Sequence, residues 1–474
     1  MEKRNSSAKV VWMNRTKIAQ ITEKHIDQEL TVAGWVRTLR AQKNFAFLEL
    51  SDGSTLTHLQ VLLDHTLPQY EEHLNALSTG TALSITGTLV KSPGKRQSWE
   101  LKAASLTLFG TCLAEDYPLQ KKRHSFEFLR TIAHLRPRTN TQGAMLRVRN
   151  ALSMATHRFF QERGFFYVQT PIITASDCEG GGEQFLVTTL DVANPPRHSD
   201  NSVDFSRDFF GKPAYLTVSG QLNAETLACA LGDVYTFGPT FRAENSHTSR
   251  HLSEFWMIEP ELAFADLQDD MECAESYLKF VLAYVCQYCP KEIDFFDAFI
   301  EKGLSKRLQQ LIETPFARLS YTEAIHILQR SGRSFECSVQ WGENLQSEHE
   351  RYLAEEHCKQ PVIVTDYPER IKAFYMRTND DGKTVAAMDV LVPKIGEIIG
   401  GSQREERLDQ LKQKMELFNL RPEEYWWYLQ LRQYGTVPHA GFGVGFERLV
   451  LLATGLENIR DTIPFPRFPG HADF

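Results

Sequence analysis

Arginine, glutamate and histidine side chains gather in one short polar loop near the middle of this 474-residue chain. The loop lies within GPTFRAENSHTSRHLSEFWMIEPE, residues 238–261, between two apolar segments that are typical of paired β-strands. Its side chains that could meet a polyanion are Arg242, Glu244, His247, Arg250, His251 and Glu254. Arginine holds phosphate and carboxylate oxygens in bidentate geometry, and the ring of Phe255 offers a surface on which a base can stack. The pattern favours a polyanion clamp, while the competing interpretation is a solvated hairpin tip with incidental charges.

Two carboxylates form a second candidate site in AMDVLVPKIGEIIGGSQR, residues 387–404. Loose acids are mostly solvated, but Asp389 and Glu397 lie among apolar residues, where an unpaired charge is costly. A hard divalent cation that bridges the phosphates of ATP would satisfy both, because Mg²⁺ takes carboxylate and phosphate oxygens as ligands. These residues therefore predict a magnesium site beside a bound nucleotide.

Glycines alternate in a third segment, PHAGFGVGFERLVLLATGLENIRDTIPFPR, residues 438–467. Gly441, Gly443 and Gly445 place three positions without side chains on one strand face, which lets a nucleotide lie against the sheet. The spacing G-x-G-x-G does not match the dinucleotide-binding fingerprint. Arg448 follows at the start of an apolar helix, and a buried arginine there needs an anion such as phosphate.

The elements that position these residues belong to two domains with different periodicity. Between residues 18 and 108 five short segments alternate apolar and polar positions, which favours a five-stranded OB-fold barrel. In one of them Phe45 and Phe47 share a face, either as a platform for nucleic-acid bases or as part of the barrel core. We expect a disordered terminus at 1–15, the barrel at 16–114, a basic hinge at 115–140 and a catalytic domain at 141–474.

The expected catalytic domain begins with an amphipathic helix from Ala144 that ends at Gly164. A strand with Pro171 follows at 165–174, and residues 194–213 form a polar insertion in a loop. We expect helices over 267–333. Residues 361–377 predict a strand, a turn and a second strand.

Composition restricts the function classes further. The net charge of −8 excludes a uniformly basic nucleic-acid coat, so an RNA partner must meet local patches. Such a patch lies between Lys121 and Arg149, where eight cations face only Glu127. The eight cysteines are scattered, and the pair Cys286 and Cys289 has no second pair nearby, which favours reduced thiols in the cytosol over a zinc site. No run of about twenty apolar residues predicts a membrane span, and the short, basic, serine-containing terminus leaves an organellar presequence open.

The ordered segments resemble the class II aminoacyl-tRNA synthetases. The pattern F-R-x-E, a loop and R-H-x-x-E-F resembles motif two, the helix and strand after Ala144 resemble motif one, and residues 438–467 resemble motif three. The order G-W-V, F-x-F-L, D-G-S and L-Q-V resembles the anticodon-binding barrel of the aspartyl, asparaginyl and lysyl subgroup. The resemblance implies an α+β fold in which an OB-fold barrel precedes a mostly antiparallel sheet flanked by helices. It also implies a cytoplasmic homodimer whose dimer interface includes motif one.

The resemblance implies a role for each candidate residue. Catalysis falls to Arg242 and Arg448. ATP is bound by Arg242, Glu244, Arg250, His251, Phe255, Glu397 and Arg448. Asp389 and Glu397 hold Mg²⁺. The amino acid is bound by Glu179, Gln221, Glu225 and Arg404, where Glu179 belongs to the triple-glycine loop DCEGGGEQF, otherwise a flexible surface loop. Phe47 stacks on an anticodon base that Gln60 hydrogen-bonds.

One position separates the branches of the subgroup. Aspartyl enzymes carry a lysine where this chain has Ala224, and Glu225 follows it. A carboxylate at Glu225 repels aspartate but accepts a hydrogen bond from an amide. The resemblance therefore implies ATP-dependent activation of asparagine and its transfer to tRNA-Asn. The alternatives are an aspartyl enzyme with relaxed tRNA choice, an amide-forming relative, which would lack the barrel, and a non-catalytic nucleic-acid-binding paralogue, which would lose the motif arginines.

Overall fold

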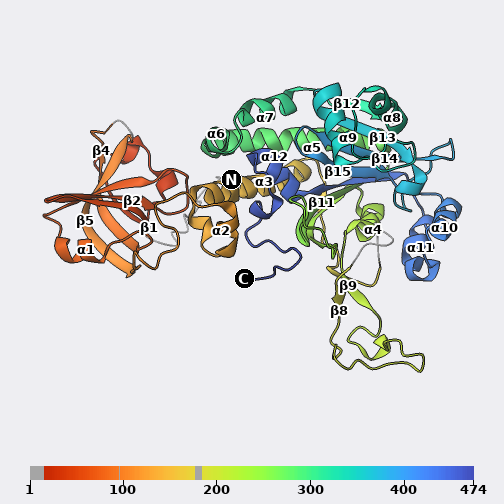
Figure 1. Ribbon diagram of the computed structural model, residues 1–474, viewed down its shortest axis with the longest axis horizontal. Helices are drawn as coiled ribbons and strands as arrows, with labels where there is room; N and C mark the ends of the chain where they lie inside the picture. The colour runs from red at the N-terminus through yellow and green to blue at the C-terminus, as the bar shows by residue number, and fades with distance from the viewer. Residues whose placement is uncertain (1–14, 95–96, 177–183) are drawn as a thin grey trace, which may run out of the picture. The chain divides into compact units, whose positions relative to one another are not determined.

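The computed structural model describes residues 15–94, 97–176 and 184–474, which form two compact units, Met1–Gly143 and Ala144–Phe474 (Figure 1). Residues 1–14, most of the terminus expected to be disordered, lie outside the described residues. The first unit contains the barrel and also residues 115–140, which we expected to form a separate hinge. Each unit is described by itself below.

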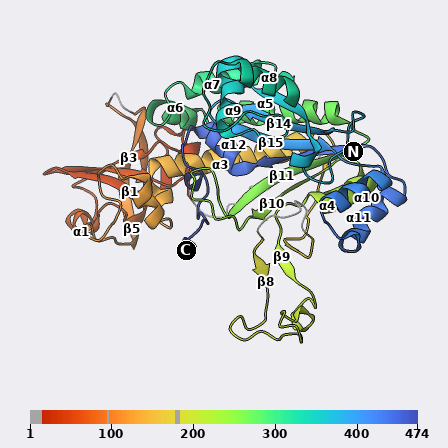
Figure 2. The same cartoon turned by 45° about the vertical axis from the view of Figure 1, so that its right-hand side comes forward.

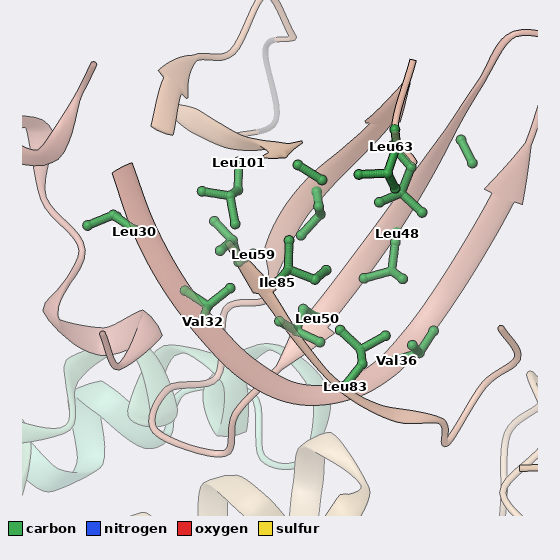
Figure 3. Close-up of a cluster of buried hydrophobic side chains, with 14 of the residues drawn as sticks. Leu30, Val32, Val36, Leu48, Leu50, Leu59, Leu63, Leu83, Ile85 and Leu101 are labelled. Carbon is green, nitrogen blue, oxygen red and sulfur yellow. The ribbon is translucent and has the colours of Figure 1, made fainter. Parts of the chain in front are cut away.

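The first unit is built around a closed barrel with the strand order β1-β2-β3-β5-β4, which confirms the five-stranded prediction. The strands are β1 (Glu29–Ala41), β2 (Phe45–Ser51), β3 (Leu59–Asp64), β4 (Ala82–Lys91) and β5 (Trp99–Gly110), with the helix α1 (Tyr70–Ala76) after β3. Alternate residues of each strand point inward because side chains of a strand have a period of two. Figure 3 shows Val32, Leu48, Leu63 and Ile85 converging from four strands, and all four are fully buried.

The same alternation decides where the aromatic side chains of β2 lie. Ala46, Leu48 and Leu50 are fully buried in the barrel, whereas Phe45 and Phe47 are only partly buried. Their rings meet edge to face with centroids 5.3 Å apart. These two residues are therefore not part of the fully buried barrel core, and their role as a platform for nucleic-acid bases stays a prediction.

Residues after β5 pack into a small cluster of their own within the first unit. Tyr117, Leu119 and Leu129 are buried together, and α2 (Phe126–Thr131) begins at the N-cap Ser125, whose hydroxyl accepts from the Phe128 N–H at 3.2 Å. Not every arginine of the expected basic patch faces solvent, because Arg136 is fully buried. The patch is therefore smaller than the sequence suggested.

The second unit is organised around an eight-stranded sheet in the order β12-β13-β14-β15-β16-β11-β10-β6. Its strands are antiparallel except at the two ends, where β12 pairs with β13 and β6 pairs with β10 in parallel. They are β6 (Phe166–Tyr167), β10 (Val234–Phe241), β11 (Glu254–Ala263), β12 (Ala317–Ser320), β13 (Val362–Pro368), β14 (Thr384–Val392), β15 (Gly396–Gln403) and β16 (His439–Gly445). This arrangement confirms the mostly antiparallel sheet.

Helices cover one face of this sheet through aromatic side chains. The helices of the unit are α3 (Asn140–Gln161), α4 (Gln221–Leu231), α5 (Leu267–Tyr288), α6 (Pro290–Phe299), α7 (Leu304–Glu313), α8 (Tyr321–Arg330), α9 (Ser347–Arg351), α10 (Leu408–Leu417), α11 (Trp426–Gln433) and α12 (Phe446–Thr454). Phe160 of α3 stacks on Tyr235 of β10 at 4.6 Å, and Tyr277 of α5 lies 6.3 Å from Phe442 of β16. In both views α5 lies along β14 and β15 (Figures 1 and 2).

Three local expectations need correction. The strand expected over 165–174 is broken at Pro171 into β6 and β7 (Ile173–Thr174), because a proline cannot donate to a ladder. The second strand expected within 361–377 is replaced by the 3₁₀ turn Glu369–Ile371, after which the chain turns inward and buries Phe374. The helical stretch 267–333 also contains β12.

The expected insertion lies on a hairpin that projects from the sheet. β8 (Leu186–Val187) and β9 (Ala214–Leu216) pair with each other, and the loop between them extends away from the unit (Figure 2). Asp208 holds the base of this loop by accepting from the hydroxyls of Thr188 and Thr189 at 2.6 and 2.9 Å. These bonds lower the pKa of Asp208 to about 2. Among the described residues, none of the helices is long and apolar enough to cross a membrane.

Candidate active site

The polar loop of residues 242–253 connects β10 to β11 and covers a cavity of about 170 Å³ over the strands. The hairpin register pairs Phe241 with Glu254, and the Arg242 N–H donates to the Ser253 carbonyl at 3.0 Å. All seven residues that we assigned to ATP line this first cavity: Arg242, Glu244, Arg250, His251, Phe255, Glu397 and Arg448. The structure thus collects residues from three separate sequence segments around one space.

Contacts within the first cavity fix the positions of Arg242, Arg448 and His251. The Arg242 guanidinium lies 5.4 Å from the centre of the Phe255 ring, a cation–π contact. Arg448 donates to the backbone carbonyl of Glu397 at 2.8 Å, and a carbonyl does not cancel its charge. The His251 ring is fixed by the Thr248 hydroxyl at 2.5 Å. Desolvation and the neighbouring Arg448 charge lower the pKa of His251, so its imidazole is neutral at pH 7.

Glycines in β15 and β16 make room at the floor of the cavities. Gly443 and Gly445 line the first cavity, and a Cβ at Gly443 would lie 2.7 Å from the Met257 methyl group. Gly441 has a different role, since a Cβ there would lie 2.3 Å from the carbonyl oxygen of Pro260 in β11. Gly441 therefore serves close strand packing, Gly443 makes room for the Met257 side chain, and Gly445 leaves an open face.

A second cavity of about 210 Å³ adjoins the first, and Arg242, Met257, Glu397 and Gly443 line both. Two residues assigned to the amino acid, Gln221 and Arg404, line it together with Asp389. Arg242 therefore stands where the two spaces meet. A group bound in one cavity could react there with a group bound in the other.

Two acids of β11 line the second cavity, although we had not assigned them to the site. Glu259 accepts from the Ser219 hydroxyl, from the Gly220 N–H at 3.1 Å and from the Thr236 hydroxyl at 2.9 Å. Glu261 accepts both arms of the Arg404 guanidinium. Burial raises the pKa of Glu261 to about 7, against the opposing charge of Arg404. Phe255, Glu259 and Glu261 share one strand face, so period-two alternation was the signal that could have revealed both acids.

Lys372 and Tyr375 are further lining residues that sequence reasoning missed. The Lys372 ammonium group donates to both carboxylate oxygens of Asp389, at 2.7 and 2.9 Å. The Tyr375 ring lies 5.3 Å from the Arg404 guanidinium. Both follow the 3₁₀ turn that replaces the expected second strand, and the sequence offered no pattern that would place this turn at the cavity.

The predicted magnesium ligands converge at the wall between the two cavities. A Cβ at Gly400 would lie 3.3 Å from Glu397 and 3.5 Å from Asp389, so both carboxylates approach the same backbone position. Glu350 lies behind them, and burial together with the Glu397 charge raises its pKa to about 7. Two carboxylates that face a phosphate site fit Mg²⁺, which binds through one or two carboxylates and substrate phosphates. The described residues contain no cluster of three or more acids, histidines or cysteines arranged for a metal.

Glu225, which we expected to touch the amino acid, does not line either cavity. It is fully buried, and its oxygens accept from Tyr428 at 2.8 Å and Arg432 at 2.8 Å and meet His439 at 2.9 Å. Burial opposes its ionisation, but Arg432 and His439 outweigh that effect and hold the pKa of Glu225 below its usual range. Glu225 reaches the second cavity through Gln221, whose amide donates to it at 3.2 Å. In this structure Glu225 contacts a residue that lines the cavity, Gln221, and does not line the cavity itself.

The remaining assigned residues lie elsewhere. Glu179 is outside the described residues. Gln60 belongs to β3 in the barrel, where its amide donates to Glu100 at 2.8 Å, and Phe47 lies on the adjoining strand β2. The expected basic patch is reduced further by buried ion pairs, because Arg147 meets Glu292 at 2.7 Å.

Comparison with known proteins agrees with both units. The family model of class II tRNA synthetases (D, K and N) matches residues 126–469, and that of the OB-fold nucleic-acid-binding domain matches residues 30–109. The chain is 63% identical over 449 residues to an asparagine–tRNA ligase of Protochlamydia amoebophila, covering 95% of this chain and 96% of that one. A ligase of the same name from Thermosynechococcus vestitus is 63% identical, with 95% and 97% covered.

Solved structures give the same result. Asparaginyl-tRNA synthetase of Pyrococcus horikoshii, complexed with asparaginyl-adenylate, superposes with a TM-score of 0.84 at 32% identity and covers 97% of this chain and 99% of its own. The Entamoeba histolytica asparaginyl-tRNA synthetase in complex with asparaginyl-adenylate gives a TM-score of 0.82 at 26% identity, with 97% and 99% covered.

Proposed function

Because this chain belongs to the class II aminoacyl-tRNA synthetases, in the group of the aspartyl, lysyl and asparaginyl enzymes, we propose that it is an asparagine–tRNA ligase. It activates asparagine with ATP as asparaginyl-adenylate and transfers the asparaginyl group to the terminal ribose hydroxyl of tRNA-Asn, with AMP as the leaving group. The observation that carries this proposal within the structure is the position of Arg242, which lines both cavities. ATP in the first cavity and the amino acid in the second would meet at this side chain.

The first step is attack of the asparagine carboxylate on the α-phosphorus of ATP. The bond between the α-phosphorus and the bridging oxygen breaks, and pyrophosphate leaves with the electron pair. Arg242 stabilises the charge that develops on the α-phosphate and the incoming carboxylate. The reaction needs no covalent intermediate with the enzyme. Phe255 provides the stacking surface for adenine, and Glu244 lines the same cavity. Arg250, His251 and Arg448 hold the outer phosphates.

Magnesium is part of the proposal. Asp389 and Glu397 would hold Mg²⁺ against the phosphates, where the ion supplies neutralising charge. Lys372 donates to both oxygens of Asp389, so the ion would share this carboxylate with the lysine.

Selectivity for asparagine over aspartate follows from the charges of the second cavity. Arg404 is 2% exposed, and Glu261 already occupies it in bidentate fashion. Ala224 is fully buried and offers no cation. An aspartate side chain would therefore bring a negative charge next to Glu261, and Arg404 is already engaged by that acid, whereas the neutral amide of asparagine meets no such cost. An aspartyl enzyme is the second candidate, and this charge balance disfavours it.

The assembly and tRNA contacts extend the proposal. Phe166 and Ile173 of β6 and β7 and Met154 of α3 are large apolar side chains exposed by 54, 42 and 54%. A second copy of the chain that covers this region would bury them, which supports a homodimer. Phe47 and Gln60 lie on neighbouring strands of the barrel and would meet the anticodon. The seven described cysteines are free thiols, which suits a cytoplasmic enzyme.

The proposal is tested by charging total tRNA with radiolabelled amino acids. We expect labelled asparagine, and not labelled aspartate, to enter acid-precipitable tRNA in the presence of ATP and Mg²⁺. Equal incorporation of aspartate would replace the function by that of a non-discriminating aspartyl enzyme. A folded protein that charges neither amino acid would contradict the proposal and favour a non-catalytic paralogue.

A further inference from the structure

A third cavity adjoins the first and shares two of its arginines, Arg250 and Arg448. Its volume of about 640 Å³ exceeds that of the first cavity, about 170 Å³, and that of the second, about 210 Å³. The second cavity adjoins the first at another place, where Arg242 and Glu397 line both. The space around the proposed ATP site therefore opens in two ways, one toward the amino acid and one toward this third cavity.

The lining of the third cavity is strongly basic. Its cations are Arg250, Lys302, Arg307, Arg351, Lys394 and Arg448. Its acids are Glu301, Glu355 and Glu457, so the lining carries three more positive than negative charges. The whole chain has a net charge of −8. A positive excess in one enclosed region of an acidic protein attracts a small anion of high charge.

The acids of this cavity are largely engaged in holding its cations. Glu301 accepts from Arg307 at 2.7 and 2.9 Å and from Lys394 at 2.6 Å. Glu355 meets Arg351 at 3.2 Å. These pairs fix three cations at the wall and neutralise two of the three acids, which leaves one positive charge among them. The other two charges of the excess come from Arg250 and Arg448 at the shared edge and from Lys302, an exposed residue at the rim, set against Glu457.

The proposed reaction produces an anion at this shared edge. Under the proposed function, on which this inference rests, adenylate formation releases the β- and γ-phosphates as pyrophosphate beside Arg250 and Arg448. Pyrophosphate cannot leave toward the second cavity while the adenylate occupies the junction at Arg242. We propose that the third cavity is a secondary binding site for inorganic pyrophosphate, which the leaving group enters after the adenylate has formed. The same site would admit pyrophosphate for the reverse reaction.

Two cations outside the proposed catalytic machinery allow a test. Lys302 and Arg351 line the third cavity but neither of the other two. The double variant Lys302→Gln/Arg351→Gln removes two charges from exposed side chains, which leaves the fold intact. The matched control is Lys306→Gln/Arg330→Gln, which removes two charges from exposed helical positions that line none of the three cavities.

The measurement is the Michaelis constant for pyrophosphate in asparagine-dependent ATP–pyrophosphate exchange. Exposed ion pairs are weak, so the loss of two should raise this constant roughly threefold to tenfold. We expect the constants for ATP and asparagine to stay within about twofold of the wild type in the same assay. The control variant should leave all three constants unchanged.

A calorimetric titration of the wild type with sodium pyrophosphate alone separates this inference from the proposed function, because it measures binding without the reaction. Binding that the double variant weakens and the control retains supports the site even if no amino acid sustains exchange. An unchanged pyrophosphate constant in the folded double variant would overturn the inference while exchange itself continued. A parallel rise in the ATP constant would also overturn it, because the cations would then act on bound nucleotide and not on released pyrophosphate.

Discussion

The buried pair of Glu225 and Arg432 offers a quantitative test of how the amino-acid cavity is built. Both side chains are 0% exposed, and the Arg432 Nη2 lies 2.8 Å from the Glu225 Oε2. Arg432 also donates to the Glu405 carbonyl at 2.9 Å and to the Tyr428 hydroxyl at 2.9 Å. Replacing Arg432 by methionine removes these bonds and leaves a buried carboxylate without its main counter-charge.

Breaking a buried ion pair from one side costs about 3–5 kcal/mol. His439 and Tyr428 keep their contacts with Glu225 in Arg432→Met, so we expect the lower end, about 3 kcal/mol. Glu225→Gln leaves Arg432 buried without a carboxylate and should cost a similar amount. The double variant removes both charges and should cost less than the sum of the two, with a coupling free energy of about 2 kcal/mol or more.

The assay is urea unfolding followed by tryptophan fluorescence, combined with exchange kinetics. Gln221 loses its anchor when Glu225 shifts, so Arg432→Met should raise the Michaelis constant for asparagine roughly threefold to tenfold and spare that for ATP. Additive unfolding free energies would refute the claim that Glu225 and Arg432 form one buried unit. A Glu225→Gln variant of normal stability that loses asparagine affinity more than roughly a hundredfold would show that Glu225 binds the substrate directly.

Three further predictions concern separate parts of the molecule. Arg242→Ala should reduce exchange at least roughly a hundredfold, because removing one preorganised donor costs about 3–4 kcal/mol, and circular dichroism should show an intact fold; near-normal exchange would remove the residue from the mechanism. Phe47→Ala should lower tRNA charging at least roughly fivefold while exchange stays normal, since one stacked base is worth about 1–3 kcal/mol. Phe45→Ala, its neighbour on the same face, should have the smaller effect, and an equal loss of charging and exchange in Phe47→Ala would contradict the anticodon role. Burial raises the pKa of the Cys289 thiol to about 11. In native protein at about pH 8, iodoacetamide should therefore label the exposed Cys337 first and Cys289 only after unfolding, which peptide mass spectrometry would show. Rapid labelling of Cys289 would mean that α5 and α6 open in the native state.

Period-two patterns predicted the strands well, because burial on one face of a sheet leaves a direct trace in the sequence. The barrel strands β2, β3 and β4 follow that rule, whereas β10 and β11 bury runs of consecutive residues and were predicted from their apolar character. Alternation failed where a turn intervened. Residues 361–377 contain two apolar runs, yet only the first forms a strand, since Phe374 is drawn into the cluster that includes Tyr428 of α11. Long-range packing of this kind is not visible in a local pattern.

The candidate site was predicted in its first cavity more fully than in its second. Arg242, Arg250 and Arg448 stand in charged motifs that few ordinary loops would carry. In the second cavity the charges compensate one another through partners distant in sequence. Glu225 and Arg432 are separated by 207 positions, and only the fold shows that they neutralise each other. A sequence presents Glu225 as an available acceptor because it does not reveal which acceptors are already occupied.

Amino-acid-dependent ATP–pyrophosphate exchange, run without tRNA over all twenty amino acids, tests the central claim most directly. The two cavities that meet at Arg242 predict exchange with asparagine and none with aspartate. Exchange with aspartate would keep the fold and the adenylate chemistry but contradict the charge balance around Arg404 and Glu261. Silence with every amino acid would contradict the assignment of the two cavities to ATP and an amino acid.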